Sequence, residues 1–267
     1  AGVYQLDYAY SRQDKERVSL REALETTGYM GNHSLQLNTL KAAFELHIEQ
    51  GPILESAGRT IGVVTGIQGC SWLDVILRGS PVHAGPTPME TRRDPWRAAL
   101  PIIRCAYQLC EQNAPWSRCT IGDVEIKPGS RNTVPEILRV SIDLRHPDAQ
   151  VLENMLTELR RTIEREAAAS NVDVEVYEVF RMRPTSFDAA LIETIKNATQ
   201  RMQYAYQKIV SGAGHDSLHI ATVAPTAMIF VPCAGGISHN EAESAIPSDI
   251  TAGANVLLQA TLSVAND

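Results

Sequence analysis

The sequence is short of basic residues, of long apolar runs and of paired cysteines. Its 24 Lys and Arg are outnumbered by 31 Asp and Glu, giving a formal net charge of −7. This argues against a nucleic-acid or anionic-membrane surface, because both need a basic patch. No apolar run approaches the roughly 20 residues of a membrane span. The five cysteines show no Cys-x-x-Cys spacing, so we expect neither a zinc ribbon nor a disulfide framework, but reduced thiols in a cytoplasmic protein.

Composition and pattern predict an α/β protein. Of its residues, 44% are hydrophobic and 21% are charged, which is typical of a globular protein with a packed core. Between 66 and 182 the pattern runs strand, helix, strand, strand, helix, strand, with the helices over 91–113 and 148–170. This order is typical of a ferredoxin-like α+β unit. We predict that the unit is inserted between residues 1–65 and 183–267, which form one α/β domain.

Strands are expected from period-2 alternation in four segments of the inserted unit. They are 70–78, 118–127, 138–144 and 171–177. Before the unit, Ser19 and Glu22 have the spacing of a capping box that opens a short helix, and Asn38 or Thr39 is expected to begin another helical turn. After it, Ser248 or Asp249 is expected to cap a final helix.

One buried strand lacks enough neighbours in this sequence. The continuous apolar run Ala227–Val231 is short enough for a strand that is buried on both faces. Such a strand needs partners on both sides, and the two flanking stretches supply few strands. The chain also begins at Ala1, without an initiator Met and without the basic and apolar segments of a signal peptide. We therefore expect strands upstream of Ala1 in a longer parent chain.

The segment 43–51 places an imidazole near the end of a strand. Its apolar and polar residues alternate, as in a strand with one polar face, and Gly51 and Pro52 end it. His47 then lies between two glutamates just before a turn, where it can serve as a metal ligand or an acid–base group. The alternative is a solvated strand face that carries a histidine, and alternation alone favours that alternative.

Other loops carry further candidates. His239 follows the buried run across a Gly-Gly turn, and ligands of α/β folds gather beyond the carboxyl ends of strands. The turn around Gly214 offers backbone N–H groups to an anion, or is a tight turn capped by Asp216. Prolines fix a loop around His83, and Arg145 ends a strand where it can hold a carboxylate. The structural alternatives are surface histidines, ordinary turns and a surface ion pair.

Together these motifs resemble the M20-type metal-dependent amidohydrolases of the hydantoinase/carbamoylase subfamily. That group includes N-carbamoyl-L-amino acid hydrolases, allantoate and ureidoglycolate amidohydrolases, and β-ureidopropionases. The motifs that carry the resemblance are, in chain order, Phe44–Glu55, Gly62–Gly69, His83–Met89, Arg92–Asp94, Asn132–Pro135, Asp143–Arg145, Ser211–Asp216, Met228–Pro232 and Gly236–Glu241. They cover nearly the whole chain and say little about the substrate.

The resemblance implies a metal-binding α/β domain and an inserted lid, residues 66–182, through which two subunits form a homodimer. It implies two divalent metal ions per subunit, zinc or manganese, with nickel and cobalt also compatible with imidazole and carboxylate ligands. His47 matches the ligand of one metal and His239 the ligand of the other. The positions that match substrate-binding residues are Gln50, His83, Asn132, Arg145 and Gly214.

The resemblance also implies roles for individual residues and identifies family residues that are missing from this sequence. Arg145 would hold the substrate carboxylate, and His83 would polarise the scissile carbonyl and stabilise the oxyanion. His83 and Asn132 would reach into the partner subunit's site. The family's first metal-binding His, its bridging Asp and its Glu–Glu pair, which includes the general base, have no counterpart here. We therefore expect a truncated chain that is metal-poor and inactive by itself.

The expected reaction of the parent enzyme is hydrolysis of the C–N bond of a ureido substrate by metal-activated water. The substrate would be an N-carbamoyl-L-amino acid, allantoate or ureidoglycolate, and ammonia and carbon dioxide would be released. One alternative is an M20 peptidase or aminoacylase. Another is a non-catalytic dimerisation or binding module built on the lid. The segment 44–50, together with Asn132 and Arg145, favours the ureido branch.

Overall fold

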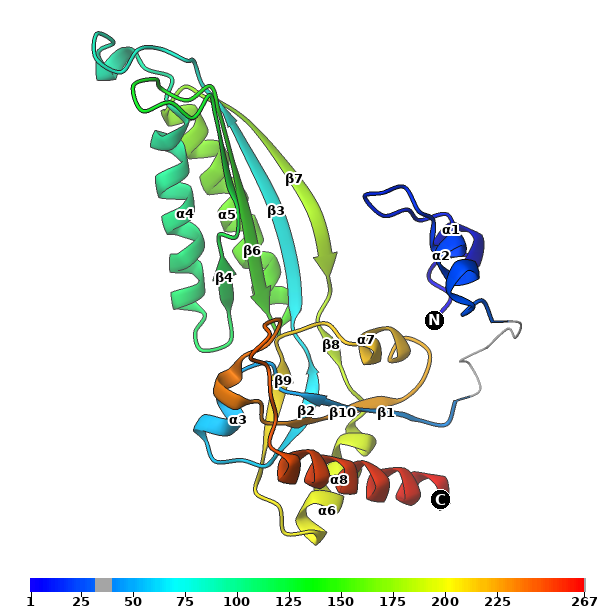
Figure 1. Ribbon diagram of the computed structural model, residues 1–267. Helices are drawn as coiled ribbons and strands as arrows, with labels where there is room; N and C mark the ends of the chain where they lie inside the picture. The colour runs from blue at the N-terminus through cyan, green and yellow to red at the C-terminus, as the bar shows by residue number, and fades with distance from the viewer. Residues whose placement is uncertain (32–39, 267) are drawn as a thin grey trace.

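The computed structural model describes residues 1–31 and 40–266, which contain two five-stranded sheets. Figure 1 shows one sheet low in the molecule and the other rising above it, and we call them the lower and the upper sheet. The α/β class expected from the sequence is confirmed. The helical turn expected at Asn38 or Thr39 lies outside the described residues.

Two short helices, α1 (Leu6–Tyr10) and α2 (Leu20–Thr27), precede the sheets. The expected capping box is present, since Ser19 accepts a bond from the Glu22 N–H while the Glu22 carboxylate accepts one from the Ser19 N–H. Neither helix buries a residue, and Figure 1 shows both to one side of the two sheets. None of the helices in the described parts of the chain combines the length and the apolarity needed to cross a membrane.

The lower sheet is mixed and surrounds one buried strand. Its strands are β1 (Ala43–Ile48), β2 (Ile61–Ile67), β8 (Thr185–Ser186), β9 (Tyr206–Ser211) and β10 (Thr226–Val231). Every residue of β10 is buried, as expected from its continuous apolar run. It lies between β1, to which it is parallel, and β2, to which it is antiparallel. β9 runs parallel to β2, and β8 runs antiparallel to it.

Helices cover both faces of the lower sheet. They are α3 (Ile53–Ser56), α6 (Ala189–Arg201), α7 (Asp216–Ile220), α8 (Pro247–Asn266) and the 3-10 turn η3 (Ala234–Gly236). α6 and α8 bury Ile195 and Val256 against the sheet, whereas α7 faces the other side beside β1 (Figure 1). The caps expected at Ser248 and Asp249 are wrong, because the helix already begins at Pro247, whose missing N–H suits the first helical position.

The upper sheet has the ferredoxin-like arrangement expected from the sequence. Its strands are β3 (Gly69–Arg78), β4 (Arg118–Thr120), β5 (Val124–Lys127), β6 (Ile137–His146) and β7 (Asp173–Met182). They pair antiparallel in the order β4-β6-β3-β7, with β5 also on β6. The helices α4 (Pro95–Gln112) and α5 (Ala149–Ala169) cover one face of the sheet (Figure 1). The domain boundaries drawn from the sequence stay a prediction.

Two expected elements of the upper unit differ in the structure. The single strand expected over 118–127 is split into β4 and β5, because Asp123 turns aside to exchange hydrogen bonds with Ser141. The helix expected over 91–113 begins only at Pro95. Asp94 caps it by accepting from the Trp96 N–H, and residues 89–91 form a separate 3-10 turn, η2 (Met89–Thr91).

Candidate metal and substrate site

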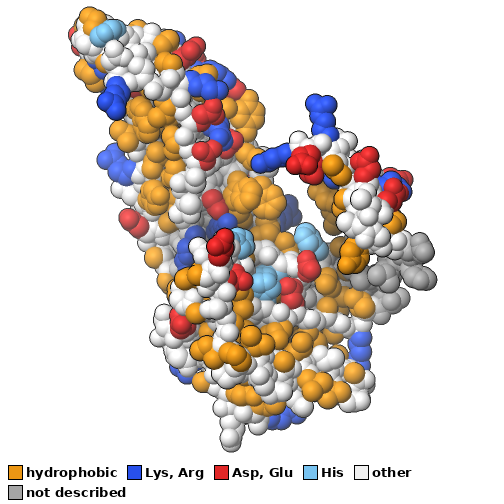
Figure 2. Space-filling model, viewed as in Figure 1, with side chains coloured by type: hydrophobic (Ala, Val, Ile, Leu, Met, Phe, Trp, Pro, Cys, Tyr) orange, Lys and Arg blue, Asp and Glu red, His pale blue; other side chains and the backbone are white. Residues whose placement is uncertain are grey.

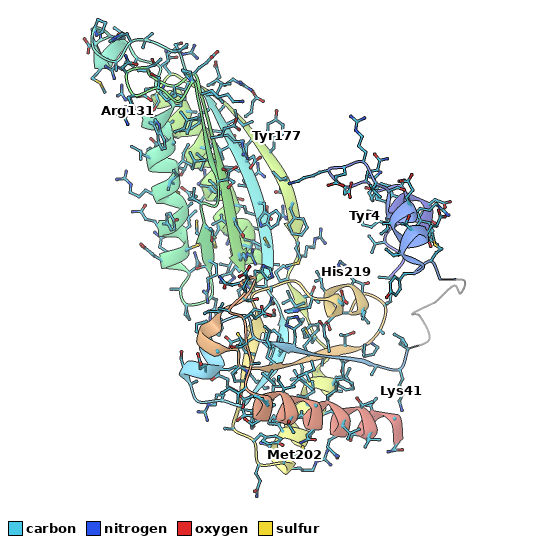
Figure 3. All side chains as sticks on the ribbon, in the orientation of Figure 1. Tyr4, Lys41, Arg131, Tyr177, Met202 and His219 are labelled. Carbon is cyan, nitrogen blue, oxygen red and sulfur yellow. The ribbon has the colours of Figure 1, made fainter. Side chains whose placement is uncertain are left out.

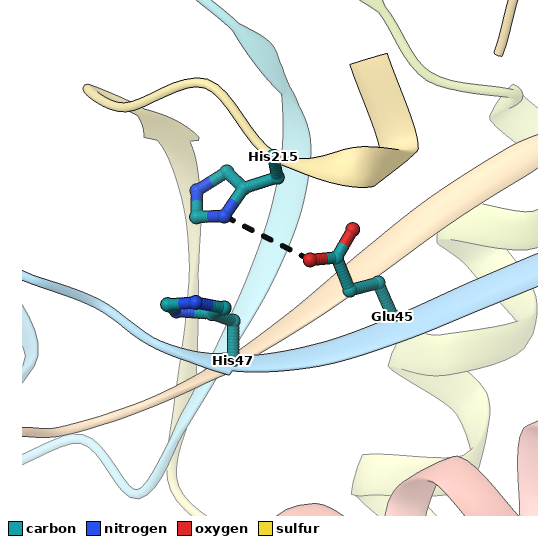
Figure 4. A group of neighbouring side chains, drawn as sticks. All are labelled: Glu45, His47 and His215. Carbon is teal, nitrogen blue, oxygen red and sulfur yellow. Dashed lines mark ion pairs between the residues drawn. The ribbon is translucent and has the colours of Figure 1, made fainter. Parts of the chain in front are cut away.

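Three side chains of types that can bind a metal ion meet where β1 faces α7 (Figure 4). Ligand atoms of Glu45, His47 and His215 all lie within 4.8 Å of one another, and this is the one such group of three in the described part of the chain. Glu45 and His47 share a face of β1 because they are two residues apart, and His215 follows β9. Two imidazoles and one carboxylate make a donor set that suits zinc or manganese.

Hydrogen bonds prepare both rings for coordination. His47 Nδ1 lies 2.9 Å from the carbonyl oxygen of Ile48, which only accepts, so Nδ1 carries the proton and Nε2 keeps its lone pair. His215 Nε2 lies 2.8 Å from Ser211 Oγ, whose hydroxyl donates to the Ala213 carbonyl at 2.9 Å. His215 Nδ1 is then the unprotonated nitrogen. Each ring therefore presents a lone pair, the form that binds a metal.

The environment of this group favours a neutral imidazole at His215. The His215 side chain is 2% exposed. Burial lowers its pKa and His47 lowers it further, against the opposing effect of Glu45 and Asp216. Glu45 Oε2 accepts from the N–H and the hydroxyl of Ser217, at 2.8 and 2.6 Å. Its Oε1 lies 3.9 Å from His215 Nδ1. In the described residues Glu45 pairs with no Lys or Arg, so no basic side chain competes with a cation for it.

A cleft of about 440 Å³ lies beside this group, where the lower sheet meets the base of the upper one. Gln50, Arg145 and His239 line it together. Figure 2 shows histidines and carboxylates side by side at this level of the molecule. Gln50 Nε2 donates to Ser238 Oγ at 3.0 Å, which ties the end of β1 to the His239 loop. The structure thus brings together three side chains predicted from the sequence, while His239 is not part of the Glu45 group.

Backbone strain marks the same place. Gln50 and His239 have φ angles of +59° and +54°, a region that residues other than Gly rarely adopt. Gly236 has a φ of +65°, and a Cβ there would lie 2.6 Å from the Pro52 nitrogen. Only glycine lets the His239 loop approach the turn after β1 so closely.

Arg145 is oriented toward the turn that contains Gly214. Its guanidinium makes three hydrogen bonds to Asp143, and Nη1 donates to the Gly212 carbonyl at 2.8 Å. The bonds to Asp143 raise the pKa of Arg145 despite its burial. The alternative of an Asp216 cap is wrong, since His215 is the N-cap residue and Asp216 begins α7.

His83 and Asn132 lie together at the far end of the upper sheet. His83 pairs with Thr133 in an isolated bridge, and the Ala84 N–H donates to the Asn132 carbonyl. Arg131, labelled in Figure 3, marks this tip. β3 has ten residues, so it spans about 30 Å. Within one chain the structure therefore does not bring His83 and Asn132 to Gln50 and Arg145.

Sequence reasoning missed Glu45 and His215 as partners of His47. The alternation over 43–49 already placed Glu45 on the polar face with His47. The turn at 212–216 was noted for its backbone N–H groups and not for its imidazole. No local spacing links His47 with His215, so only the fold reveals that group.

Comparisons with known proteins agree with this geometry. A model of peptidase family M20/M25/M40 matches residues 20–263. An N-carbamoyl-L-amino-acid amidohydrolase of Rhizobium meliloti is 38% identical over 99% of this chain and 64% of its own length. An allantoate amidohydrolase of Escherichia coli is 36% identical over 82% of this chain and 53% of its own length.

A solved structure is also similar over the entire chain. It is an amidase of the hydantoinase/carbamoylase family from Burkholderia multivorans, with 44% identity, a TM-score of 0.94, and coverage of 100% of this chain and 65% of its own. This chain thus spans less than two thirds of the length of these relatives. On the family match and these identities, the chain belongs to peptidase family M20/M25/M40.

Proposed function

We propose that the protein hydrolyses the C–N bond of a linear ureido (N-carbamoyl) substrate with the help of divalent metal ions. The observation that carries the proposal is the metal-ligand group around His47 next to a cleft lined by Gln50, Arg145 and His239. The substrate is an N-carbamoyl-L-amino acid, allantoate or ureidoglycolate. Relatives named for N-carbamoyl-L-amino acids and for allantoate support this class.

We assign one metal ion to His47 and a second to His239. Glu45 and His215 extend the donor group of His47, and the set suits zinc or manganese and also accepts nickel or cobalt. A divalent ion bound there supplies Lewis-acid polarisation and lowers the pKa of a coordinated water. Because the family's remaining ligands have no counterpart in this sequence, we propose that the chain alone is metal-poor and does not turn over.

Residues of the cleft bind and orient the substrate. The Arg145 guanidinium is held by Asp143 and Gly212, so it is already positioned to bind a carboxylate with little loss of side-chain freedom. Gln50 offers an amide beside it, and the turn at Gly214 offers backbone N–H groups. Together they place the ureido carbon near the His47 group.

The remaining hydrogen-bond donors to the substrate come from a second copy of the chain. We propose a homodimer formed through residues 66–182, in which His83 and Asn132 of one subunit enter the site of its partner. Gly85 N–H donates to His83 Nδ1 at 3.0 Å, so Nε2 carries the proton and can donate to a developing oxyanion. Arg92 holds this loop through bonds to the Thr87 and Ala84 carbonyls. A cytoplasmic location stays a prediction.

The test combines turnover with binding. Ammonia release and calorimetric affinity are measured with added Mn²⁺ or Zn²⁺, using N-carbamoyl-L-alanine, allantoate, ureidoglycolate, L-alanyl-L-alanine and N-acetyl-L-alanine. We expect the ureido ligands to bind more tightly than the dipeptide and the acyl amino acid, with no turnover by the chain alone. Tighter binding of the dipeptide would overturn the ureido class. Stoichiometric zinc together with turnover would overturn the expected inactivity.

The dimer has its own readout. Sedimentation measures the mass in solution, and the His83→Ala and Asn132→Ala variants test the contribution of the partner. We expect a dimer whose ureido affinity falls in both variants, while Arg201→Gln, on the exposed end of α6, leaves it unchanged. A monomer with wild-type affinity would contradict the shared site.

A further inference from the structure

A second guanidinium lines the cleft beside Arg145. Arg118 begins β4 and is the direct antiparallel partner of Arg145 on β6. Side chains in such positions share a face of the sheet, with Cβ atoms about 4.5–5.5 Å apart. Both residues line the cleft of about 440 Å³. Like charges directly opposite one another destabilise a sheet, so an anion bound between the two arginines would relieve their repulsion.

The protein compensates only one of the two arginines. Arg145 pairs with Asp143 through three hydrogen bonds. Arg118 forms no ion pair in the described part of the chain. Its Nη1 donates to the carbonyl oxygens of Pro115 and Ser117, at 2.6 and 2.8 Å. These bonds fix one edge of the guanidinium and leave Nε and Nη2 without a partner among the described residues.

No other charge in the cleft takes the place of that anion. The carboxylate of Glu49 also lines the cleft. However, its two oxygens accept from the N–H groups of Ile53 and Leu54 at 2.8 and 2.7 Å, so they are bound to the first turn of α3. Gln68 is neutral and donates to the Gly212 carbonyl at 3.1 Å. The wall around Arg118 therefore keeps a positive charge that suits an anionic ligand.

There is space for a substrate side chain next to this charge. Arg118 also lines an adjoining cavity of about 390 Å³, with Trp116 from the same loop and Ile53 from α3. A substrate whose α-carboxylate binds Arg145 can direct its side chain along this wall. The two carboxylates of an acidic amino acid are a few bonds apart, a separation similar to the roughly 4.5–5.5 Å between the Cβ atoms of directly opposed residues of a sheet.

We propose that Arg118 binds a second carboxylate of the substrate, so that this site selects ureido substrates with an acidic side chain, such as N-carbamoyl-L-glutamate. This assignment rests on the proposed function, in which Arg145 holds the α-carboxylate. Arg118 then acts as a specificity determinant, because a neutral side chain leaves its guanidinium without an anion.

The test compares ligands of equal size and different charge. Calorimetry with added Mn²⁺ gives the Kd of N-carbamoyl-L-glutamate and of N-carbamoyl-L-glutamine for the chain and for Arg118→Gln. We expect the glutamate derivative to bind about tenfold more tightly, as charged hydrogen bonds typically provide. The ratio should fall to about one in Arg118→Gln. Arg118→Lys should retain part of it, and Arg201→Gln, far from the cleft, should retain all of it.

Every other outcome contradicts either the role of Arg118 or the proposed ureido function. A wild-type ratio near one overturns the role of Arg118. So does an equal loss for both ligands in Arg118→Gln, which would place Arg118 on the α-carboxylate that both share. If only L-alanyl-L-glutamate binds, and more tightly than L-alanyl-L-glutamine, the ureido function fails and the Arg118 assignment stands. Absence of binding by all four ligands overturns both.

Discussion

The two sheets hold their carboxylates in different ways. The acidic side chains on the strands of the upper sheet pair with arginines, and Arg139 alone contacts Asp74, Asp123 and Glu125. In the lower unit, Glu45 is held by the N–H and hydroxyl of Ser217, and Glu49 by two backbone N–H groups. Neither of these two carboxylates pairs with a Lys or Arg in the described part of the chain.

This difference indicates that the carboxylates of the lower unit are more suitable for binding a cation than those of the upper sheet. A carboxylate paired with a guanidinium has its charge compensated, so it offers little to a metal ion. A carboxylate held only by neutral donors has a fixed position and no basic side chain beside it that compensates a charge. The lower unit therefore has electrostatics that suit a cation, and under the proposed function the upper unit supplies arginines and loops to the substrate.

The largest expected effect is on metal affinity. His47→Ala should weaken Zn²⁺ or Co²⁺ binding by more than about 100-fold, because loss of a ligand exceeds the 10–100-fold cost of losing an outer partner. Asp74→Asn, which removes a carboxylate paired with Arg139 in the upper unit, should change the affinity little. Competition with a chromophoric chelator measures both. Equal losses of metal affinity in the two variants would mean that the metal does not bind at His47. The two sheets would then not differ in their suitability for a cation.

Backbone strain gives the next largest effect. Gly236→Ala should lower the free energy of unfolding by about 3 kcal/mol, since it adds a clash with Pro52 to the cost of a left-handed φ. Gly129 in the upper unit also has a φ of +69°, but the atom nearest to an added Cβ lies 3.5 Å away. Gly129→Ala should therefore lower the free energy of unfolding by only about 1–2 kcal/mol. Urea unfolding measures the two. A larger loss at Gly129 would contradict the view that strain concentrates beside the cleft.

The two kinds of carboxylate should also differ in stability. Glu49→Gln replaces one of the two carboxylate oxygens, each of which accepts from one N–H group, with an NH₂ group that cannot accept, at a cost of about 2 kcal/mol. Glu178→Gln removes a partly exposed partner of Arg160 and should cost less than about 1 kcal/mol. Chemical denaturation compares the variants. Similar losses would contradict the expected difference between the two kinds of carboxylate.

The fold was largely predictable because its elements follow local rules. The alternation in β6, the apolar run of β10 and the Ser19 capping box each specify an element from a few neighbouring residues. The elements that differ from the prediction do so because of contacts that the local sequence pattern does not contain. Asp123 interrupts an edge strand through a bond to Ser141, and that partner lies on a different strand.

The candidate site was only partly predictable. The position of His47 on a polar strand face followed from period 2, but its neighbour His215 depends on how β1, β10, β2 and β9 are ordered in the sheet. Hydrophobic periodicity does not encode that order. The distance of His83 from the cleft likewise depends on where the long strands of the upper sheet begin and end.

The smallest expected effect is on the pH dependence of stability. It concerns the thiol of Cys70, which is buried at the base of the upper sheet. Burial, with the charge of Asp143 adding to it, raises the pKa of Cys70 from 9.0 to about 12. Above pH 9 the unfolded chain loses this proton and the folded chain keeps it, so stability falls as pH rises. The fall should reach about 1 kcal/mol between pH 8 and pH 10. Cys70→Ala should remove this part of the loss in urea unfolding, whereas Val75→Ala on the same strand should lower stability equally at both pH values. An unchanged pH dependence in Cys70→Ala would mean that the thiol ionises in the folded protein as readily as in the unfolded chain.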